Sequence, residues 1–200
     1  MISRVYLVRH GETAWSKSGR HTGRTEISLS EQGEVNARYL APWLASVRFS
    51  GVFVSPRVRA QQTCELAGLG GAAQPDTELA EWDYGDFEGL SSAEIQGRHP
   101  GWNLFTDGCP GGESPAQVSG RADRVIARVR SLDGNVALFS HGHFGRVLAA
   151  RWAGFPVEAG ERLQLDTASV GIFAYEHANP AAPVISLWNV RPSDGAGAPS

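Results

Sequence analysis

Compact runs of apolar residues alternate with segments of helical periodicity along most of the chain. The runs from Val5 to Val8, Val52 to Ser55 and Val136 to Ser140 are rich in valine, leucine and aromatic residues, and the last two end in serine. Such runs are typical of parallel strands that are buried on both faces. Because helical segments separate them, the sequence predicts an α/β fold in which a mostly parallel sheet lies between helices.

Capping residues and prolines set the expected bounds of the helices. A serine followed by proline, or by glutamate three residues later, marks the start of a helix. Pro42 lies inside the first expected helix and should kink or split it. The expected helices are Ser30 to about Val47, Ser55-Pro56 to about Gly68, Ser91 to before Pro100, a segment opened by Ser114-Pro115, and His143–Ala153, with later strands at Ser169–Tyr175 and Val184–Val190.

A length of 200 residues suits one domain, predicted over residues 1–190, and residues 191–200 are predicted to be a disordered tail. A formal net charge of −3 gives no electrostatic reason to bind nucleic acid or an anionic membrane. Cys64 and Cys109 have neither zinc-site nor disulfide-framework spacing. No signal peptide is visible, and no apolar run approaches the ~20 residues of a membrane helix. We therefore expect a cytoplasmic protein.

Polar residues follow the three apolar runs at the points where the predicted strands end. These residues are Arg9-His10-Gly11, Ser55 to Arg59, and His141-Gly142. Because ligands of open α/β sheets bind at the carboxyl ends of the strands, the three loops are expected to meet. Their histidines and arginines, together with the N-terminus of a helix beginning at Pro56, suit a tetrahedral anion such as a phosphoryl group. A neutral imidazole at His10 can attack phosphorus while nearby cations offset the transition-state charge.

The leaving oxygen of such a reaction needs a proton. Glu81 is predicted to supply it because this acid stands beside aromatic residues, although the sequence leaves Asp83, Asp86 and Glu88 as alternatives. A lone histidine at a strand end, or a lone arginine or glutamate, is more often structural. The convergence of three strand-end motifs favours the functional interpretation. No metal-ligating cluster is visible, so neither a metal nor a cofactor is expected.

The ordered set of motifs resembles the histidine phosphatase superfamily, which includes the cofactor-dependent phosphoglycerate mutases. The motifs that carry the resemblance are Leu7–Thr13, Thr22–Thr25, Leu29–Gly33, Ser55–Thr63, Gly85–Gly89 and Ser140–Gly142. The resemblance implies a three-layer α/β/α sandwich and a nucleophile, His10, that becomes phosphohistidine. It further implies that Arg9, Arg59 and His141 hold the phosphoryl group, and that Glu81 protonates the leaving oxygen and then activates water.

Departures from the family pattern bear on the branch. Ser16 stands where many members have asparagine, Thr22-Gly23 replaces a Gln-Gly pair, and the insertion that follows the acid motif of the mutases is absent. The loops are most similar to those of acid phosphatases and sedoheptulose-bisphosphatase-like enzymes. The residues expected to bind substrate are Ser16, Thr22, Gly23, Tyr84 and Gly142.

The leading prediction is a metal-independent phosphatase that hydrolyses phosphomonoesters of small metabolites, including sugar phosphates or bisphosphates. One alternative is a cofactor-dependent phosphoglycerate mutase, which needs a closed site that excludes water. Another is an inactive scaffold that binds phosphorylated ligands. The predicted partner is a small phosphorylated metabolite, and an antiparallel edge strand leaves a homodimer as an option. The loop Gly101–Glu113 is expected to shape the pocket over the leaving group, and His99, His143 and His177 are expected to lie outside the catalytic set.

Overall fold

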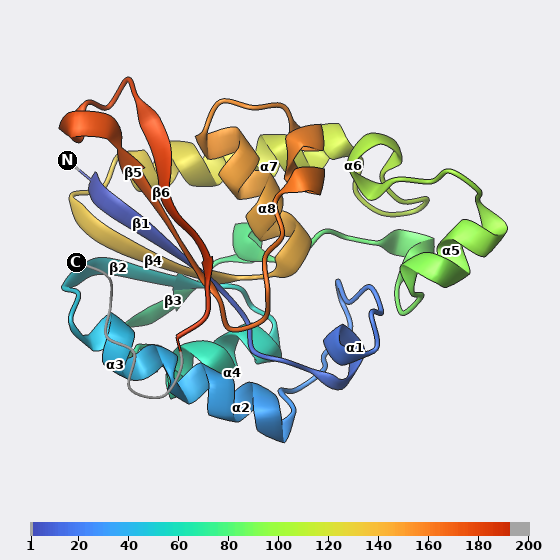
Figure 1. Cartoon of the computed structure of the whole chain (residues 1–200), viewed down its shortest axis with the longest axis horizontal. Coiled ribbons are helices and arrows are strands. Elements are labelled where there is room, and N and C mark those ends of the chain that lie inside the picture. Colours follow the sequence, from blue (N-terminus) through green and yellow to red (C-terminus); the bar gives the residue numbers. More distant parts are fainter. Residues whose placement is uncertain (1, 193–200) are drawn as a thin grey trace.

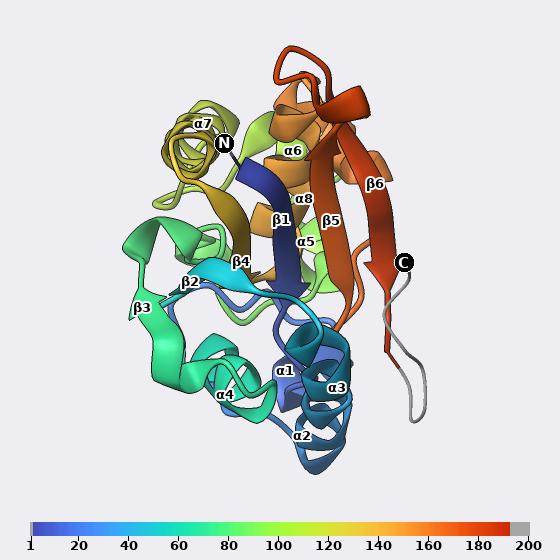
Figure 2. The same ribbon diagram turned by 90° about the vertical axis from the view of Figure 1, so that its left-hand side faces the viewer.

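The computed structural model describes residues 2–192 and contains a six-stranded sheet. Its strands are β1 (Ile2–Arg9), β2 (Phe49–Val54), β3 (Ala73–Pro75), β4 (Gly134–Ser140), β5 (Val170–Tyr175) and β6 (Pro183–Val190). Their order across the sheet is β3-β2-β4-β1-β5-β6, as Figure 2 shows. The first four strands run parallel to one another, whereas β5 is antiparallel to β1 and to β6. The predicted mostly parallel sheet is therefore confirmed.

Helices cover both faces of the sheet. They are α1 (Ala14–Lys17), α2 (Glu31–Arg38), α3 (Leu40–Ala45), α4 (Val58–Leu66), α5 (Ser92–Arg98), α6 (Leu104–Asp107), α7 (Pro115–Arg130) and α8 (Gly142–Trp152). α2, α3 and α4 lie against one face, and α7 and α8 lie against the other (Figure 1). This arrangement confirms the predicted three-layer α/β/α sandwich.

The two faces of the sheet carry separate hydrophobic clusters, which explains why β1 is apolar from Val5 to Val8. Val5 and Leu7 pack into the cluster that includes side chains of α7 and α8. Tyr6 and Val8 point the opposite way and pack with residues of α3 and α4. Successive side chains of a strand alternate between faces, so a strand with both faces covered needs apolar residues at every position.

The expected break of the first helix at Pro42 is confirmed, whereas the expected start of the next helix is wrong. The segment from Ser30 is divided at Tyr39 into α2 and α3, because Pro42 has no N–H to donate to the carbonyl of Arg38, where α2 ends. The prediction that Ser55 caps the next helix is wrong: α4 begins at Val58 with Arg57 as its N-cap, and the Ser55 hydroxyl contacts His141 instead. The elements β3, α1 and α6 were not predicted, since each has four residues or fewer and shows no periodicity.

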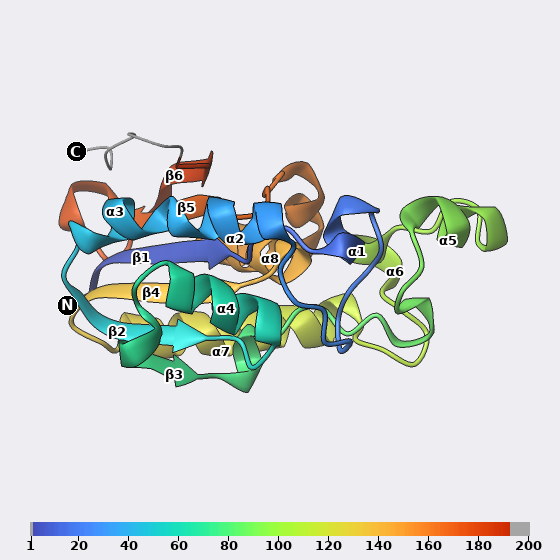
Figure 3. The same ribbon diagram turned by 90° about the horizontal axis from the view of Figure 1, so that it is seen from below.

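The carboxyl ends of β1, β4 and β2 meet at the same edge of the sheet. Arg9 pairs with Ser140, and Val54 pairs with Phe139. The ladder extends beyond the strands, because His10 N–H donates to the Ser140 carbonyl (3.0 Å) and Ser55 N–H to the Phe139 carbonyl (2.9 Å). The backbone at these strand ends is thus held rigidly. Beyond them lie α1, α5 and α6, as Figure 3 shows.

Several predictions about the whole chain remain predictions. Residues 193–200 of the expected tail lie outside the described residues, whereas Arg191 lies 3.9 Å from the Asp166 carboxylate. Strand β6 forms one edge of the sheet, where a second copy of the chain would pair in the expected homodimer. Within residues 2–192, none of the helices combines the length and apolar character needed to cross a membrane. The single-domain boundaries and the cytoplasmic location are likewise untested.

Candidate active site

A cavity of about 170 Å³ lies at this edge of the sheet. Seven of the ten residues predicted to be catalytic or to bind substrate line it: Arg9, His10, Ser16, Thr22, Glu81, Tyr84 and Gly142. The remaining three, Arg59, His141 and Gly23, are buried and do not line the cavity. The strand ends and the acid-bearing segment therefore converge as the sequence predicted.

His10 is held in the orientation that a nucleophile requires. Its Nδ1 lies 2.7 Å from the carbonyl oxygen of Gly11, and because a carbonyl only accepts, Nδ1 must carry the proton. The lone pair of Nε2 is then available to a reacting atom. Burial lowers the pKa of His10 well below 6.5, and the positive charges of Arg59 and Arg9 lower it further. The imidazole is neutral near pH 7, as nucleophilic attack requires.

Arg9 brings a buried positive charge to the wall of the cavity. One terminal nitrogen of its guanidinium donates to the carbonyl of Leu165, while the Nε atom is buried with no hydrogen-bond partner. Gly142 lets this group lie close to the N-terminus of α8, since a Cβ at position 142 would lie 3.1 Å from the Arg9 Cζ. Buried donors are normally bonded, so an unpaired one at a cavity wall suits an anionic ligand.

Arg59 is fully buried, and its terminal nitrogens bind the protein itself. They donate to the carbonyls of Thr25 (3.1 Å), Thr22 (2.8 Å) and Gly23 (3.2 Å), while Nε has no partner. The Arg59 carbonyl accepts from Thr63, whose hydroxyl oxygen accepts from Gly11 N–H (2.9 Å). Arg59 therefore ties the loop of residues 22–25 to the turn beside His10 and places a positive charge close to the imidazole.

His141 lies 5.2 Å from His10, measured between ring centroids. Its Nε2 is 2.6 Å from the Ser55 hydroxyl oxygen, and that oxygen also accepts from Arg57 N–H. We assign the hydroxyl proton to the bond with Nε2, an assignment that places the ring proton on Nδ1. Nδ1 is buried and has no hydrogen-bond partner, so it can donate to an anion held between the two rings. Burial lowers the pKa of His141 well below 6.5, and Arg59 lowers it further.

This geometry predicts a role for Ser55. Ser55→Ala removes the group that fixes the His141 tautomer, and we expect the rate of phosphoryl transfer to His10 to fall at least about tenfold. Single-turnover kinetics with a chromogenic phosphate ester measures that rate. Ser55→Thr keeps the hydroxyl and should retain more of it. An unchanged rate in the alanine variant would contradict the assigned tautomer.

Glu81 is bound to the N-terminus of α8. Its Oε1 accepts from Trp82 N–H (2.9 Å) and Phe144 N–H (2.7 Å), and its Oε2 accepts from His143 N–H (3.1 Å). Oε2 thus has one protein donor where Oε1 has two. Because a carboxylate oxygen has two lone pairs, Oε2 retains a position that can carry and transfer a proton.

The other acids that the sequence left open have different partners. The Asp83 carboxylate pairs with Arg24 and accepts from Gly85 N–H, and the Glu88 carboxylate accepts from the N–H groups of Gly23 and Thr25. Neither these two acids nor Asp86 lines the cavity. The structure therefore favours Glu81.

The predicted substrate-binding residues divide into two groups. Ser16, Thr22, Tyr84 and Gly142 line the cavity, although the Ser16 hydroxyl is bonded within the capping box of α1. Gly23 does not line it, and the expectation of a substrate contact there is not supported. A Cβ at Gly23 would lie 2.7 Å from the Trp82 carbonyl oxygen, so glycine is needed for close packing of two loops.

The expected anion site at the start of α4 is also wrong. Val58 N–H, at the first position of the helix, donates to the Glu26 carboxylate (2.9 Å), which also pairs with Arg57 at 3.0 Å. An acid of the protein therefore occupies the positive end of this helix. The hydrogen bond to Val58 and the Arg57 charge lower the pKa of Glu26 despite an opposing effect of desolvation.

Sequence reasoning missed several residues of the cavity wall, among them Arg20, His21, His143 and Arg146. The rings of His21 and His143 stack at 5.6 Å with an interplanar angle of 10°, and His143 Nδ1 lies 2.6 Å from the Tyr84 hydroxyl. Burial lowers the pKa of both histidines, and for His143 the charge of Arg146 adds to the effect. His143, expected outside the catalytic set, is thus part of the wall. Its position one residue beyond His141-Gly142 was the available signal.

The loop Gly101–Glu113 contributes no residue to the cavity wall. It packs behind that wall, where the Trp102 ring lies 5.8 Å from His21 and the Phe105 ring lies 5.7 Å from His143. The loop supports the residues that face the leaving group instead of contacting it, which refines the expectation from the sequence.

Because His10 and His141 are buried, we expect the protein to lose stability in acid. The pKa values of His10 and His141 are well below 6.5 in the folded protein, so below that pH the unfolded chain binds more protons than the folded one. The contribution of these histidines to the free energy of unfolding is therefore complete above pH 6.5 and falls as the pH drops below it. We expect a loss of about 1 kcal/mol per histidine between pH 7 and pH 5.5. Urea unfolding at the two pH values measures it, and His10→Ala should reduce the difference by about 1 kcal/mol; an undiminished difference in this variant would contradict the assignment.

The match to known families decides the identity of the fold. Residues 5–190 match the model of the histidine phosphatase superfamily (branch 1). The chain belongs to this family. That finding confirms the resemblance on which the roles of His10, Arg9, Arg59, His141 and Glu81 were predicted.

Individual relatives cover nearly the whole chain. An acid phosphatase of Mycobacterium tuberculosis is 43% identical over 188 residues, covering 92% of each chain. Sedoheptulose 1,7-bisphosphatase of Saccharomyces cerevisiae is 30% identical, covering 94% of this chain and 93% of its own. A solved structure of an open reading frame from Mycobacterium tuberculosis superposes with a TM-score of 0.88 at 40% identity, covering 96% and 99% of the two chains. These relatives support the predicted phosphomonoesterase function.

Proposed function

We propose that the protein is a phosphomonoesterase that transfers a phosphoryl group first to Nε2 of His10 and then to water. The observation that carries this proposal is the orientation of the neutral His10 beside unpaired buried donors. Its Nδ1–H is fixed by the Gly11 carbonyl, its ring lies 5.2 Å from the His141 ring, and buried nitrogens of Arg9, Arg59 and His141 have no hydrogen-bond partner. The same groups can bind the phosphoryl oxygens and stabilise the charge of the transition state.

In the first step, the Nε2 lone pair of His10 attacks phosphorus and the bond from phosphorus to the leaving oxygen breaks. The leaving oxygen takes the proton that Glu81 carries on Oε2, so that a neutral alcohol departs. The N–H groups of Phe144 and His143 stabilise the carboxylate that remains. The positive charges of Arg9 and Arg59 offset the phosphoryl charge throughout.

In the second step, Glu81 accepts a proton from water as the water oxygen attacks the phosphohistidine. The bond between phosphorus and Nε2 breaks, inorganic phosphate is released, and both the neutral imidazole and the protonated Glu81 are restored. Together, the two steps convert one phosphate ester and one water molecule into one alcohol and one inorganic phosphate.

The leaving-group side of the cavity suits a polar alcohol such as a sugar. His21, His143 and Tyr84 present neutral groups that can donate or accept hydrogen bonds, and Arg20 and Arg146 line the cavity nearby. Sugar hydroxyls pair well with such groups. The named activity of the yeast relative, on a sugar bisphosphate, supports the same substrate class.

The test is phosphate release from a panel of sugar phosphates and phosphoglycerates, with and without EDTA. Among residues 2–192, no group of His, Cys, Asp and Glu side chains could hold a metal ion, and we expect the activity to be unaffected by EDTA. Interconversion of phosphoglycerate isomers without phosphate release would instead favour a mutase. Binding of phosphorylated ligands with no turnover, and no label on His10, would favour the inactive scaffold.

A further inference from the structure

The segment that carries Glu81 is held by side chains and not by regular secondary structure. Residues 81–84 belong to no helix or strand. Four consecutive carbonyls, from Glu78 to Glu81, accept hydrogen bonds from side chains: Arg121 binds those of Glu78, Ala80 and Glu81, and Ser140 binds that of Leu79. We call residues Glu78–Asp83 the acid segment. Its position depends on whatever fixes Arg121.

Every N–H of the Arg121 guanidinium is used in this arrangement. Nε and one N–H of Nη2 donate to the two carboxylate oxygens of Glu113 at 2.9 and 2.7 Å. The other N–H of Nη2 donates to the Glu81 carbonyl at 3.3 Å, and the two N–H groups of Nη1 donate to the carbonyls of Glu78 (2.9 Å) and Ala80 (2.6 Å). Five donors thus meet five acceptors. With no free donor and no place in the cavity wall, Arg121 is not a substrate ligand.

Glu113 holds the other end of the acid segment. Its Oε2 also accepts from Asp83 N–H (3.0 Å), its carbonyl accepts from the Trp82 indole N–H (2.9 Å), and its own N–H donates to the Asp83 carbonyl (2.9 Å). Arg121 and Glu113 therefore bind the backbone on both sides of Glu81.

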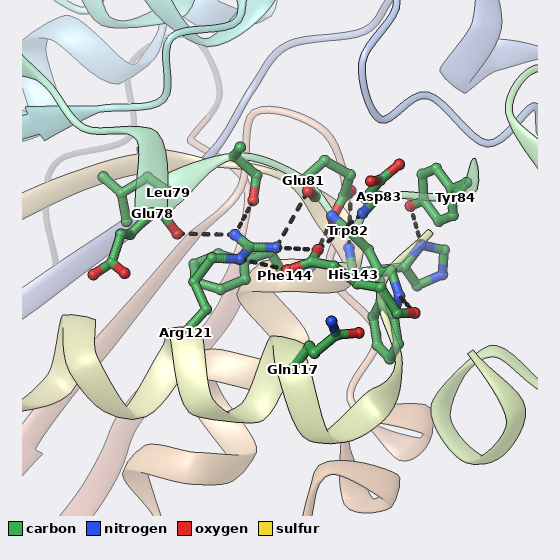
Figure 4. A network of polar contacts seen from close by, with 12 residues as sticks. Glu78, Leu79, Glu81, Trp82, Asp83, Tyr84, Gln117, Arg121, His143 and Phe144 are labelled. Atoms are coloured by element: carbon green, nitrogen blue, oxygen red, sulfur yellow. Dashed lines mark hydrogen bonds and ion pairs between the residues drawn. The ribbon is translucent and has the colours of Figure 1, made fainter. Parts of the chain in front are cut away.

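The same pair reaches the group that binds the Glu81 carboxylate. The Arg121 guanidinium lies over the Phe144 ring, 4.2 Å from its centroid, and Phe144 N–H donates to Glu81 Oε1. Figure 4 shows Arg121 between the acid segment and the start of α8. One side chain thus contacts both the backbone of the acid and the turn to which its carboxylate is bonded.

We infer that Arg121 and Glu113 are positioning residues for the general acid, fixing Glu81 relative to the leaving oxygen. This inference rests on the proposed function, in which Glu81 protonates that oxygen. Proton transfer requires hydrogen-bond distance, and a displacement of about 1 Å can cost about a hundredfold in rate. Arg121 also occupies the apolar stripe of α7 formed by Val118, Ala122 and Val125, where an aliphatic residue would otherwise fit.

The experiment compares Arg121→Met, Arg121→Lys and Glu113→Gln with the wild-type protein on two substrates. An alkyl phosphate needs protonation of its leaving oxygen, whereas p-nitrophenyl phosphate scarcely does. We expect Arg121→Met to lower kcat/KM for the alkyl phosphate about 10- to 100-fold and that for p-nitrophenyl phosphate less than about threefold. Lysine has three donors in place of five, so Arg121→Lys should restore only part of the loss.

A matched control lies on the same helix. Arg128 pairs with Asp76 and lies over the Phe53 ring, much as Arg121 pairs with Glu113 and lies over Phe144. Arg128 itself makes no hydrogen bond to the acid segment, and its partner's carboxylate accepts from the N–H of Glu78, the first residue of that segment (3.0 Å). Arg128→Met should leave the ratio of the two kcat/KM values unchanged. Thermal unfolding of all variants shows whether each is folded at the assay temperature.

A double variant separates positioning from general destabilisation. If Arg121 acts through Glu81, Arg121→Met adds little to the alkyl-phosphate loss already caused by Glu81→Gln. Equal losses on both substrates, or full additivity with Glu81→Gln, would overturn the inference while leaving the proposed function intact. The proposed function itself fails if the wild-type protein releases no phosphate or if Glu81→Gln shows no substrate selectivity.

Discussion

His10→Ala is expected to lower phosphate release by at least about four orders of magnitude, because it removes the atom to which the phosphoryl group is transferred. The surrounding cations remain in this variant and can still bind the substrate. We therefore expect kcat to collapse while a phosphorylated ligand is still bound. Release of phosphate from a sugar phosphate measures the first effect, and calorimetric titration with inorganic phosphate measures the second.

The fold should survive this change. The His10 side chain makes one hydrogen bond, to the Gly11 carbonyl, which contributes about 1 kcal/mol. His99→Ala is the matched control, since His99 is exposed and does not line the cavity, and it should retain full activity. Acid-labile phosphate bound to the wild-type protein and absent from His10→Ala would support the intermediate. Turnover retained by a folded His10→Ala variant would exclude His10 as the nucleophile.

Glu81→Gln is expected to reduce kcat/KM for sugar phosphates by about 10²–10³-fold while changing that for p-nitrophenyl phosphate only slightly. Glutamine cannot donate a proton in place of Oε2, and a sugar alkoxide is a far poorer leaving group than p-nitrophenolate. The Gln oxygen can still accept from Trp82 and Phe144, but its NH2 group would face the N–H of His143. A small decrease in the melting temperature is therefore expected as well.

Asp83→Asn provides the comparison for Glu81→Gln, because the sequence left both acids open. The Asp83 carboxylate is directed at Arg24 and Gly85 and does not line the cavity. This variant should lose similar amounts of activity on both substrates or none at all. Selective loss on sugar phosphates in Asp83→Asn, with Glu81→Gln unaffected, would reverse the assignment of the general acid.

Much of the fold followed from local patterns. The apolar runs of β1, β2 and β4 and the serine caps of α2, α5 and α7 depend on residues within a few positions of one another. Such interactions can be recognised without knowing the tertiary structure. The start of α4 could not, because Ser55, which has the local signature of a cap, hydrogen-bonds to His141 from a distant strand end.

The sequence by itself determined the fold class, the family, and the meeting of His10 and His141 at one sheet edge. Three buried parallel strands must bring their carboxyl ends together, so the residues after them converge whatever the loops do. Only the tertiary structure distinguishes the surroundings of Glu81 from those of Asp83 and Glu88, since each carboxylate binds donors far away in the chain.

Tertiary structure alone also revealed the stacking of His21 on His143 and the hydrogen bonds by which Arg121 and Glu113 hold the acid segment. Most hydrogen bonds of a buried charge or imidazole are satisfied within the protein, and those partners come from segments that the sequence keeps apart. Local sequence patterns cannot show which polar groups will pair across the core. That pairing sets the orientation of the acid, and with it the chemistry at the end of β1.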